Sequence, residues 1–182
     1  RIINEPTAAA MAYGYGQSRS QRIVVYDLGG GTFDVSVLHM GDDLIEVVST
    51  GGDTFLGGDD FDAVIADHIR RSFESDGLGT IPSTHQARVR LHHAAEKLKR
   101  SLGENNEATT KIPGLARDSA GAPMDVEAGL SRSMARQLCM PLIQRSFVVC
   151  DDALAQAGLS PAQVDGIVLV GGMTRFPIIK EA

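Results

Sequence analysis

The segment from Asp27 to Asp34 combines residue types that can hold a phosphate together with its metal ion. Its three consecutive glycines, residues 29–31, leave main-chain NH groups unshielded, so successive amides can form an anion-binding nest. Asp27, Thr32 and Asp34 add hard oxygen groups of the kind that Mg²⁺ prefers. An apolar run at residues 23–25 precedes the glycines, so a glycine-rich β-hairpin is the alternative interpretation of this segment taken alone.

A second glycine loop lies far along the chain. The apolar run at 166–170 predicts a buried strand, which leads directly into Gly171 and Gly172. Ligands of α/β proteins gather at the carboxyl ends of strands, so two such loops that converge would grip a polyphosphate or a nucleoside. Neither loop is followed by the Lys-Ser or Lys-Thr of a Walker motif, and neither has the dinucleotide-binding spacing. The pattern therefore disfavours both of these common nucleotide folds.

The elements that position the first loop are predicted by local patterns. Asn4 can cap a helix that ends near Gly14 or Gly16. Alternating apolar and polar residues then predict three strands, at 22–27, 32–40 and 43–49. With a hairpin turn at 41–43, these strands form an antiparallel meander.

The middle of the chain switches to helical periodicity. Apolar spacings of three and four predict one helix around residues 61–73 and another over 84–102. On the second helix, Glu96, Arg100 and Gly103 cluster on a different face from the apolar stripe. Short strand-like pieces are expected over 107–126. A helix capped by Ser131 and bent near Pro141 is expected to run to Gly158.

Composition limits the class of protein. The 182 residues are 43% hydrophobic, enough for a core, and no apolar stretch approaches the roughly 18 residues needed to cross a bilayer. A net charge of −6 without a long basic run argues against nucleic-acid binding. Cys139 and Cys150 are eleven residues apart on one expected helix, too far for a disulfide, so we expect free thiols in a reducing cytoplasm. We therefore expect a soluble cytoplasmic protein without membrane contacts.

Four stretches, in this order, resemble the signatures of the DnaK-type, seventy-kilodalton heat-shock chaperones: residues 2–10, 26–34, 52–62 and 170–177. They span almost the whole chain. The resemblance implies an α/β, actin-like or ribonuclease H-like ATPase fold. Within it, this chain is similar to the second lobe of the nucleotide-binding domain, with residues 1–57 and 130–182 as the core β-sheet subdomain and 58–129 as an inserted helix-rich α+β subdomain.

The resemblance also implies roles around the phosphates of ATP or ADP. Asp27 would hold the water shell of Mg²⁺ or of a monovalent cation such as K⁺. The phosphates would be wrapped by Gly29, Gly30 and Gly31. Thr32 would lie beside the γ-phosphate, and Glu5 and Asp34 would order the metal's waters and the attacking water. Phosphoryl transfer needs such groups because it depends on positioning and charge neutralisation.

On the nucleoside side, the resemblance implies that Glu96 and Lys99 bind ribose hydroxyls and that Arg100 and Arg175 sandwich adenine. Gly103, Gly171, Gly172 and Met173 would complete this part of the site. At two positions the chain departs from the family pattern: Gly103 stands where a serine is usual, and Met173 stands where a small polar residue is usual. The lost hydroxyls would weaken hydrogen bonds to the base and leave phosphate binding less affected.

The function implied is ATP-driven chaperone activity, with cycles of binding and release of unfolded client proteins. The chain begins at Arg1 without a methionine, so we expect a fragment that carries half of the cleft and hydrolyses little ATP alone. The alternative is a binding module for co-chaperones: a nucleotide-exchange factor on residues 58–129, and a J-domain protein near Arg1 and the Asp42-Asp43 turn. A sugar kinase or actin-like filament protein is the third option, disfavoured by residues 4–7 and 56–62.

Two patterns in the sequence resemble metal sites, and ordinary surface structure is the alternative for each. His92 and His93 with Glu96 resemble a zinc pair at helical spacing, but no third ligand is evident in the sequence. The acidic run at 59–62 lacks the glycine and terminal glutamate of a calcium loop. Acidic residues that favour a helix N-terminus are the better interpretation of that run.

Overall fold

A computed structural model describes residues 2–14, 20–41, 44–77 and 79–182. Arg1 and the Asp42-Asp43 turn, both named above for co-chaperone docking, lie outside these residues. The chain divides into two compact units: residues 1–58 with 142–174, and residues 59–141 with 175–182. The sequence placed the corresponding boundaries after residues 57 and 129.

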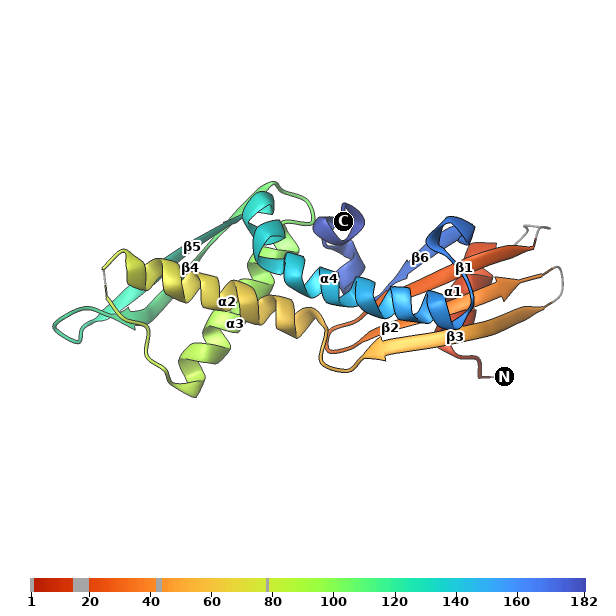
Figure 1. Ribbon diagram of the computed structural model, residues 1–182. Helices are drawn as coiled ribbons and strands as arrows, with labels where there is room; N and C mark the ends of the chain where they lie inside the picture. Colours follow the sequence, from red (N-terminus) through yellow and green to blue (C-terminus); the bar gives the residue numbers. More distant parts are fainter. Residues whose placement is uncertain (1, 15–19, 42–43, 78) are drawn as a thin grey trace. The chain divides into compact units, whose positions relative to one another are not determined.

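The first unit is built on a four-stranded sheet in the order β3-β2-β1-β6 (Figure 1). The bounds are β1 (Gln21–Leu28), β2 (Phe33–Met40), β3 (Ile45–Asp53) and β6 (Gly166–Val170). The first three strands are antiparallel neighbours, which confirms the predicted meander, and β6 runs parallel to β1. The third strand continues four residues beyond the predicted end at Ser49, because Gly51 and Gly52 still pair with β2.

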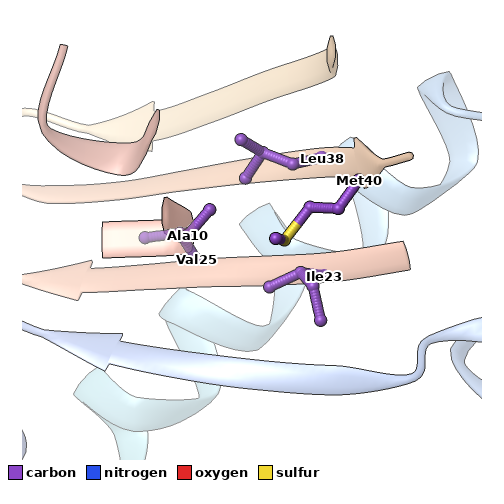
Figure 2. Close-up of a cluster of buried hydrophobic side chains, with 5 residues drawn as sticks. All are labelled: Ala10, Ile23, Val25, Leu38 and Met40. Atoms are coloured by element: carbon purple, nitrogen blue, oxygen red, sulfur yellow. The ribbon is translucent and has the colours of Figure 1, made fainter. Parts of the chain in front are cut away.

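One face of this sheet is covered by α1 (Glu5–Gly14). Figure 2 shows Ala10 of the helix over a cluster of buried side chains from β1 and β2, namely Ile23, Val25, Leu38 and Met40. Val168 and Val170 of β6 pack against the same cluster. These residues occupy alternate positions along their strands, so the period-two pattern directs them all to one face.

The opposite face lies under the second half of α4 (Arg132–Gln156). Ser49 Oγ donates to the main-chain oxygen of Ala153 at 2.7 Å. The buried Ser146 hydroxyl donates to Ile143 O at 2.7 Å, so its oxygen accepts the hydrogen bond from the Tyr26 hydroxyl, also at 2.7 Å. Burial raises the pKa of Tyr26, and the two hydroxyls satisfy each other in the core.

The last strand corrects one prediction. β6 was expected to be buried, but it lies at the edge of the sheet, and its residues are alternately half-buried and exposed. Ile167 is 61% exposed and Leu169 37%. A continuous apolar run therefore marks a strand correctly without showing that both of its faces are covered.

The second unit contains α2 (Gly58–Ser75), α3 (His85–Ser101), β4 (Glu107–Arg117) and β5 (Pro123–Ser131). The Thr84 hydroxyl caps α3 by accepting from Ala87 N at 3.2 Å, as the predicted start at Thr84 requires. β4 and β5 form one long antiparallel hairpin instead of the short pieces expected. Pro113 and Gly114 lie at a register shift within the hairpin, where Gly114 has a φ of +58°.

Two short 3-10 turns and a short helix complete the chain: η1 (Pro161–Gln163), η2 (Gly172–Arg175) and α5 (Pro177–Lys180). α4 begins as predicted, since Ser131 Oγ accepts from Met134 N at 3.2 Å, and it continues on both sides of Pro141. No helix in the described part of the chain has the length and apolarity needed to cross a bilayer.

Both cysteines lie in α4 and are free thiols, as the sequence predicted. Burial raises the pKa of Cys139 to about 12 and that of Cys150 to about 11. At pH 8 neither residue carries much thiolate, so a disulfide reagent should label the native chain slowly, with Cys150 ahead of the fully buried Cys139. Labelling should accelerate as the pH approaches 11 and become fast in denaturant. Rapid labelling of Cys139 in a folded Cys150→Ser variant would contradict this.

Candidate functional site

The first glycine loop lies between the carboxyl end of β1 and the start of β2. Gly29 N donates to Thr32 O at 3.0 Å, which closes the connection between the two strands. Because β1 and β2 pair antiparallel, Asp27 and Asp34 are direct cross-strand partners. The segment is therefore a glycine-rich hairpin that carries a carboxylate on each strand beside the loop, and binding of a phosphate or metal ion by it stays a prediction.

The Asp27 carboxylate lies near two other acidic groups. The pKa of Asp27 is raised, first by partial burial and then by the negative charges of Glu5 and Asp34. Thr32 Oγ1 donates to Asp34 Oδ2 at 3.3 Å, which places the hydroxyl within the same group. Two negative charges near the partly buried Asp27 carboxylate favour a bound cation, and oxygen ligands suit Mg²⁺. The donors present therefore fit the metal that the sequence implied.

Residues 57–58 contact the main chain of this loop. Gly58 N donates to Gly29 O at 3.0 Å. Gly57 approaches so closely that a Cβ built on it would lie 2.4 Å from the Cα of Gly31. Glycine is required here for main-chain contact, whereas a Cβ on Gly30 would meet nothing within 4 Å. The sequence singled out Gly57 only as part of a motif and gave it no structural role.

The second glycine loop reaches the same strand end within the first unit. Val170 pairs with Asp27, and the chain then turns at Gly171, whose φ is +88°. A Cβ on Gly171 would lie 2.2 Å from Leu28 O and 2.8 Å from Asp27 Oδ1. Thr174 Oγ1 donates to Gly171 O at 2.7 Å and holds the turn. The two glycine loops therefore converge at Asp27, as the sequence predicted.

Around this point, the side chains differ in what they offer to a ligand. Glu5, Thr32 and Asp34 are exposed, as are Gly30, Gly31 and Gly172, while Asp27, Gly29 and Gly171 are half-buried. Met173 is 6% exposed, so its side chain belongs to the core and only its main chain is left for contact with a ligand. The buried Met173 thioether packs in the core, so this position does not need the small polar residue that is usual in the family pattern in order to fold.

Four of the residues predicted to bind the nucleoside, Glu96, Arg100, Gly103 and Arg175, lie in the second unit. On α3, Arg100 Nη1 forms an ion pair with Glu96 Oε1 at 3.4 Å, one helical turn away. Gly103 follows the end of α3, where its NH donates to Arg100 O at 3.0 Å, and a Cβ on it would lie 4.0 Å from Arg175 O. The main chain at Arg175 therefore lies beside Gly103. The Arg100 and Arg175 side chains are both exposed.

Lys99 is placed differently from its predicted role at the ribose. Its ammonium forms an ion pair with Asp62 Oδ2 at 2.8 Å, and the Lys99 and Asp62 side chains are only 9% and 4% exposed. A buried charge needs a partner of opposite sign, so this pair links α2 to α3 inside the second unit. Asp62 was not among the predicted site residues, although its position on the apolar stripe of α2 was a usable signal.

The predicted phosphate-binding residues all lie in the first unit, whereas the predicted nucleoside-binding residues are divided, because Gly171, Gly172 and Met173 belong to the first unit and the others to the second. The first contains the two glycine loops with Glu5, Asp27, Thr32 and Asp34. The second contains Glu96, Arg100, Gly103 and Arg175. Chemically, the first set can hold a hydrated divalent cation and accept phosphate oxygens at main-chain NH groups, and the second presents two guanidinium groups with hydrogen-bonding neighbours.

A family model described as Hsp70 protein matches residues 1–182, which is the whole chain.

Proposed function

Because the chain belongs to the Hsp70 family of ATP-dependent chaperones, we propose that it forms the second lobe of an actin-like nucleotide-binding domain and supplies half of the ATP cleft. The observation that carries this proposal is the group of three carboxylates at the convergence of two glycine loops. The other half of the cleft and the client-binding part would come from segments outside these 182 residues. Alone, the chain would hydrolyse little ATP.

In the proposed site, the residues contributed by the first unit position the metal ion, its waters and the phosphates. Asp27 would hold the water shell of Mg²⁺ or of K⁺, and Glu5 and Asp34 would order those waters and the attacking water. Main-chain NH groups at Gly30 and Gly31 and at 171–172 would receive the phosphates, because Gly29 N already donates to Thr32 O. Thr32, which already donates to Asp34, lies beside the γ-phosphate. Bound Mg²⁺ would supply charge neutralisation at the phosphates.

For the nucleoside, we propose that Arg100 and Arg175 hold the adenine between their guanidinium planes and that Glu96 binds the ribose. The Glu96–Arg100 ion pair supports this assignment, because it orients the Arg100 guanidinium along the exposed side of α3. Lys99 is left out of the set because its ammonium is engaged with Asp62. The missing side chain at Gly103 would leave the base less firmly held than the phosphates.

Members of this family work with co-chaperones and unfolded client proteins. We propose that a nucleotide-exchange factor binds residues 58–129 and that a J-domain co-chaperone binds near the start of the chain. The two free cysteines favour the cytoplasm, because thiols stay reduced in that compartment. No observation favours a binding module without catalysis over the ATPase, so the ATPase is the function we propose.

The proposal predicts that Asp27→Asn and Thr32→Ala, in a full-length protein containing this chain, each lower ATP hydrolysis by about 10- to 100-fold and ATP affinity much less. The reason is that both groups position metal waters and the γ-phosphate without carrying most of the binding energy. Single-turnover hydrolysis and equilibrium ATP titration measure the two effects separately.

Asp165→Asn is the matched control. Asp165 is an exposed carboxylate of the same unit, and it accepts a 2.7 Å hydrogen bond from Arg22 N at the opposite end of β1. Its turnover should equal that of the wild type. Wild-type turnover in both Asp27→Asn and Thr32→Ala would refute the assignment of this loop.

A further inference from the structure

A group of three potential metal ligands lies between α2 and α3. Asp59 and Asp62 are three residues apart at the start of α2, and His92 reaches toward them from α3. One ligand atom from each residue lies within 4.8 Å of the other two. His92 Nε2 is also 3.2 Å from the main-chain oxygen of Asp59, so the imidazole is held against the first turn of α2.

One oxygen of the Asp62 carboxylate is buried without a hydrogen-bond partner. The residue is 3% exposed, and its Oδ1 has no hydrogen-bond partner, whereas its Oδ2 is bound by Lys99. An unpartnered buried carboxylate oxygen is costly, and each such atom in a folded protein needs an explanation. A cation bound at Oδ1 would satisfy this atom and leave the ion pair with Lys99 in place.

The mixture of ligand atoms selects the class of ion. Mg²⁺ and Ca²⁺ take oxygen ligands almost exclusively, while Zn²⁺ combines imidazole nitrogen with carboxylate oxygen. Asp59 is exposed and His92 half-buried, so both side chains can close the spacing around an ion that bonds at about 2.0–2.2 Å. The fourth position would be left to water or to the Asp59 main-chain oxygen.

We propose that Asp59, Asp62 and His92 form a binding site for a divalent transition-metal ion of the zinc class. This site is independent of the nucleotide function. It also replaces the pair considered in the sequence, because His92 turns toward Asp62 whereas His93 is 81% exposed and lies 3.9 Å from Glu96. A metal here would join the first turn of α2 to the middle of α3, next to the buried Asp62–Lys99 pair.

The test is a titration of the 182-residue chain with Zn²⁺ by calorimetry, and with Co²⁺ by visible absorption, whose intensity reports tetrahedral coordination. We expect one equivalent to bind. His92→Ala and Asp59→Asn should each weaken binding by about tenfold or more. His93→Ala is the matched control, because it removes the adjacent surface imidazole, and it should bind like the wild type.

Two outcomes would overturn the proposal. One is wild-type Zn²⁺ affinity in a folded His92→Ala variant, with folding checked by circular dichroism, since this would place the ion elsewhere. The other is the absence of stoichiometric binding by the wild-type chain at submillimolar Zn²⁺. Separately, displacement of the ion by equimolar Ca²⁺ would overturn the assignment to the zinc class, because an imidazole-containing site should discriminate against that cation.

Discussion

Replacing Gly57 with alanine should lower the free energy of unfolding of the first unit by about 3 kcal/mol or more. The new Cβ would lie 2.4–2.5 Å from the Gly31 N, Cα and C atoms. All three are main-chain atoms, so no flexible side chain can move aside, and the loop at residues 29–31 itself must shift. The hydrogen bond from Gly58 N to Gly29 O would be strained by the same displacement.

The effect should extend to nucleotide binding, because the loop that shifts is the one proposed to receive the phosphates. Gly30→Ala separates the two effects. A Cβ on Gly30 meets nothing within 4 Å and its φ is not positive, so stability should be unchanged or slightly higher. The added methyl group nevertheless stands on the exposed surface of the loop and should weaken phosphate binding.

Denaturant unfolding measures the stability of both variants, and ADP titration of the full-length protein measures binding. Equal stability of Gly57→Ala and the wild type would show that the close approach of Gly57 to Gly31 does not support the loop. Wild-type ADP affinity in Gly30→Ala would argue instead that the phosphates lie away from residues 29–31.

Much of the arrangement of the two glycine loops and their carboxylates could be predicted from sequence, because its determinants are local. Alternation in β1 and β2 sets which residues share a face, and three glycines between two strands fix the turn. Once the two strands are antiparallel, the pairing of Asp27 with Asp34 follows. Parallel pairing of β6 with β1 then carries Gly171 to the same strand end, as expected for loops at carboxyl ends of strands.

The remainder depends on contacts distant in sequence. Nothing local shows that Gly57 touches Gly31, or that β6 is the edge strand of the sheet formed by the described residues. The role of Lys99 was predicted from family resemblance, yet helical periodicity held a counter-signal. Lys99 is four residues from the buried Ala95 and so lies near the apolar stripe, whereas Arg100 is on the exposed side. The position of Lys99 on the helix therefore indicated that its side chain is buried, as the structure shows.

Lys99→Met should destabilise the second unit by about 3–5 kcal/mol, the usual cost of leaving a buried charge without its partner. The methionine can fill the space of the lysine stem, so the loss arises mainly at Asp62. With Lys99 gone, neither oxygen of this buried carboxylate would have a partner, because Oδ1 already lacks one. A matched surface pair, Arg71–Asp67 at 2.6 Å with side chains 78% and 50% exposed, provides the control, and Arg71→Met should cost less than about 1 kcal/mol.

The destabilisation should depend on pH in a definite direction. Burial raises the pKa of Asp62, and the hydrogen bond and charge of Lys99 oppose that rise. Removing Lys99 therefore raises the pKa of Asp62 further in the folded state, so the folded variant binds a proton that the unfolded chain has lost. Stability then falls as the pH rises from about 4, the ordinary pKa of an aspartate, toward the folded-state pKa. Relative to the wild type, Lys99→Met should lose least near pH 4 and most at neutral pH.

Urea unfolding at a series of pH values, with a chelator present to exclude bound metal, measures this difference. The double variant Asp62→Leu/Lys99→Met identifies its source. Replacing both charges with apolar groups removes the unpaired carboxylate, so the double variant should recover most of the stability lost by Lys99→Met and should show no extra dependence on pH. A double variant as unstable as Lys99→Met would mean that the loss comes from packing of the lysine stem against α2. The ion pair would then be a consequence of the packing between these helices, with little part in stabilising it.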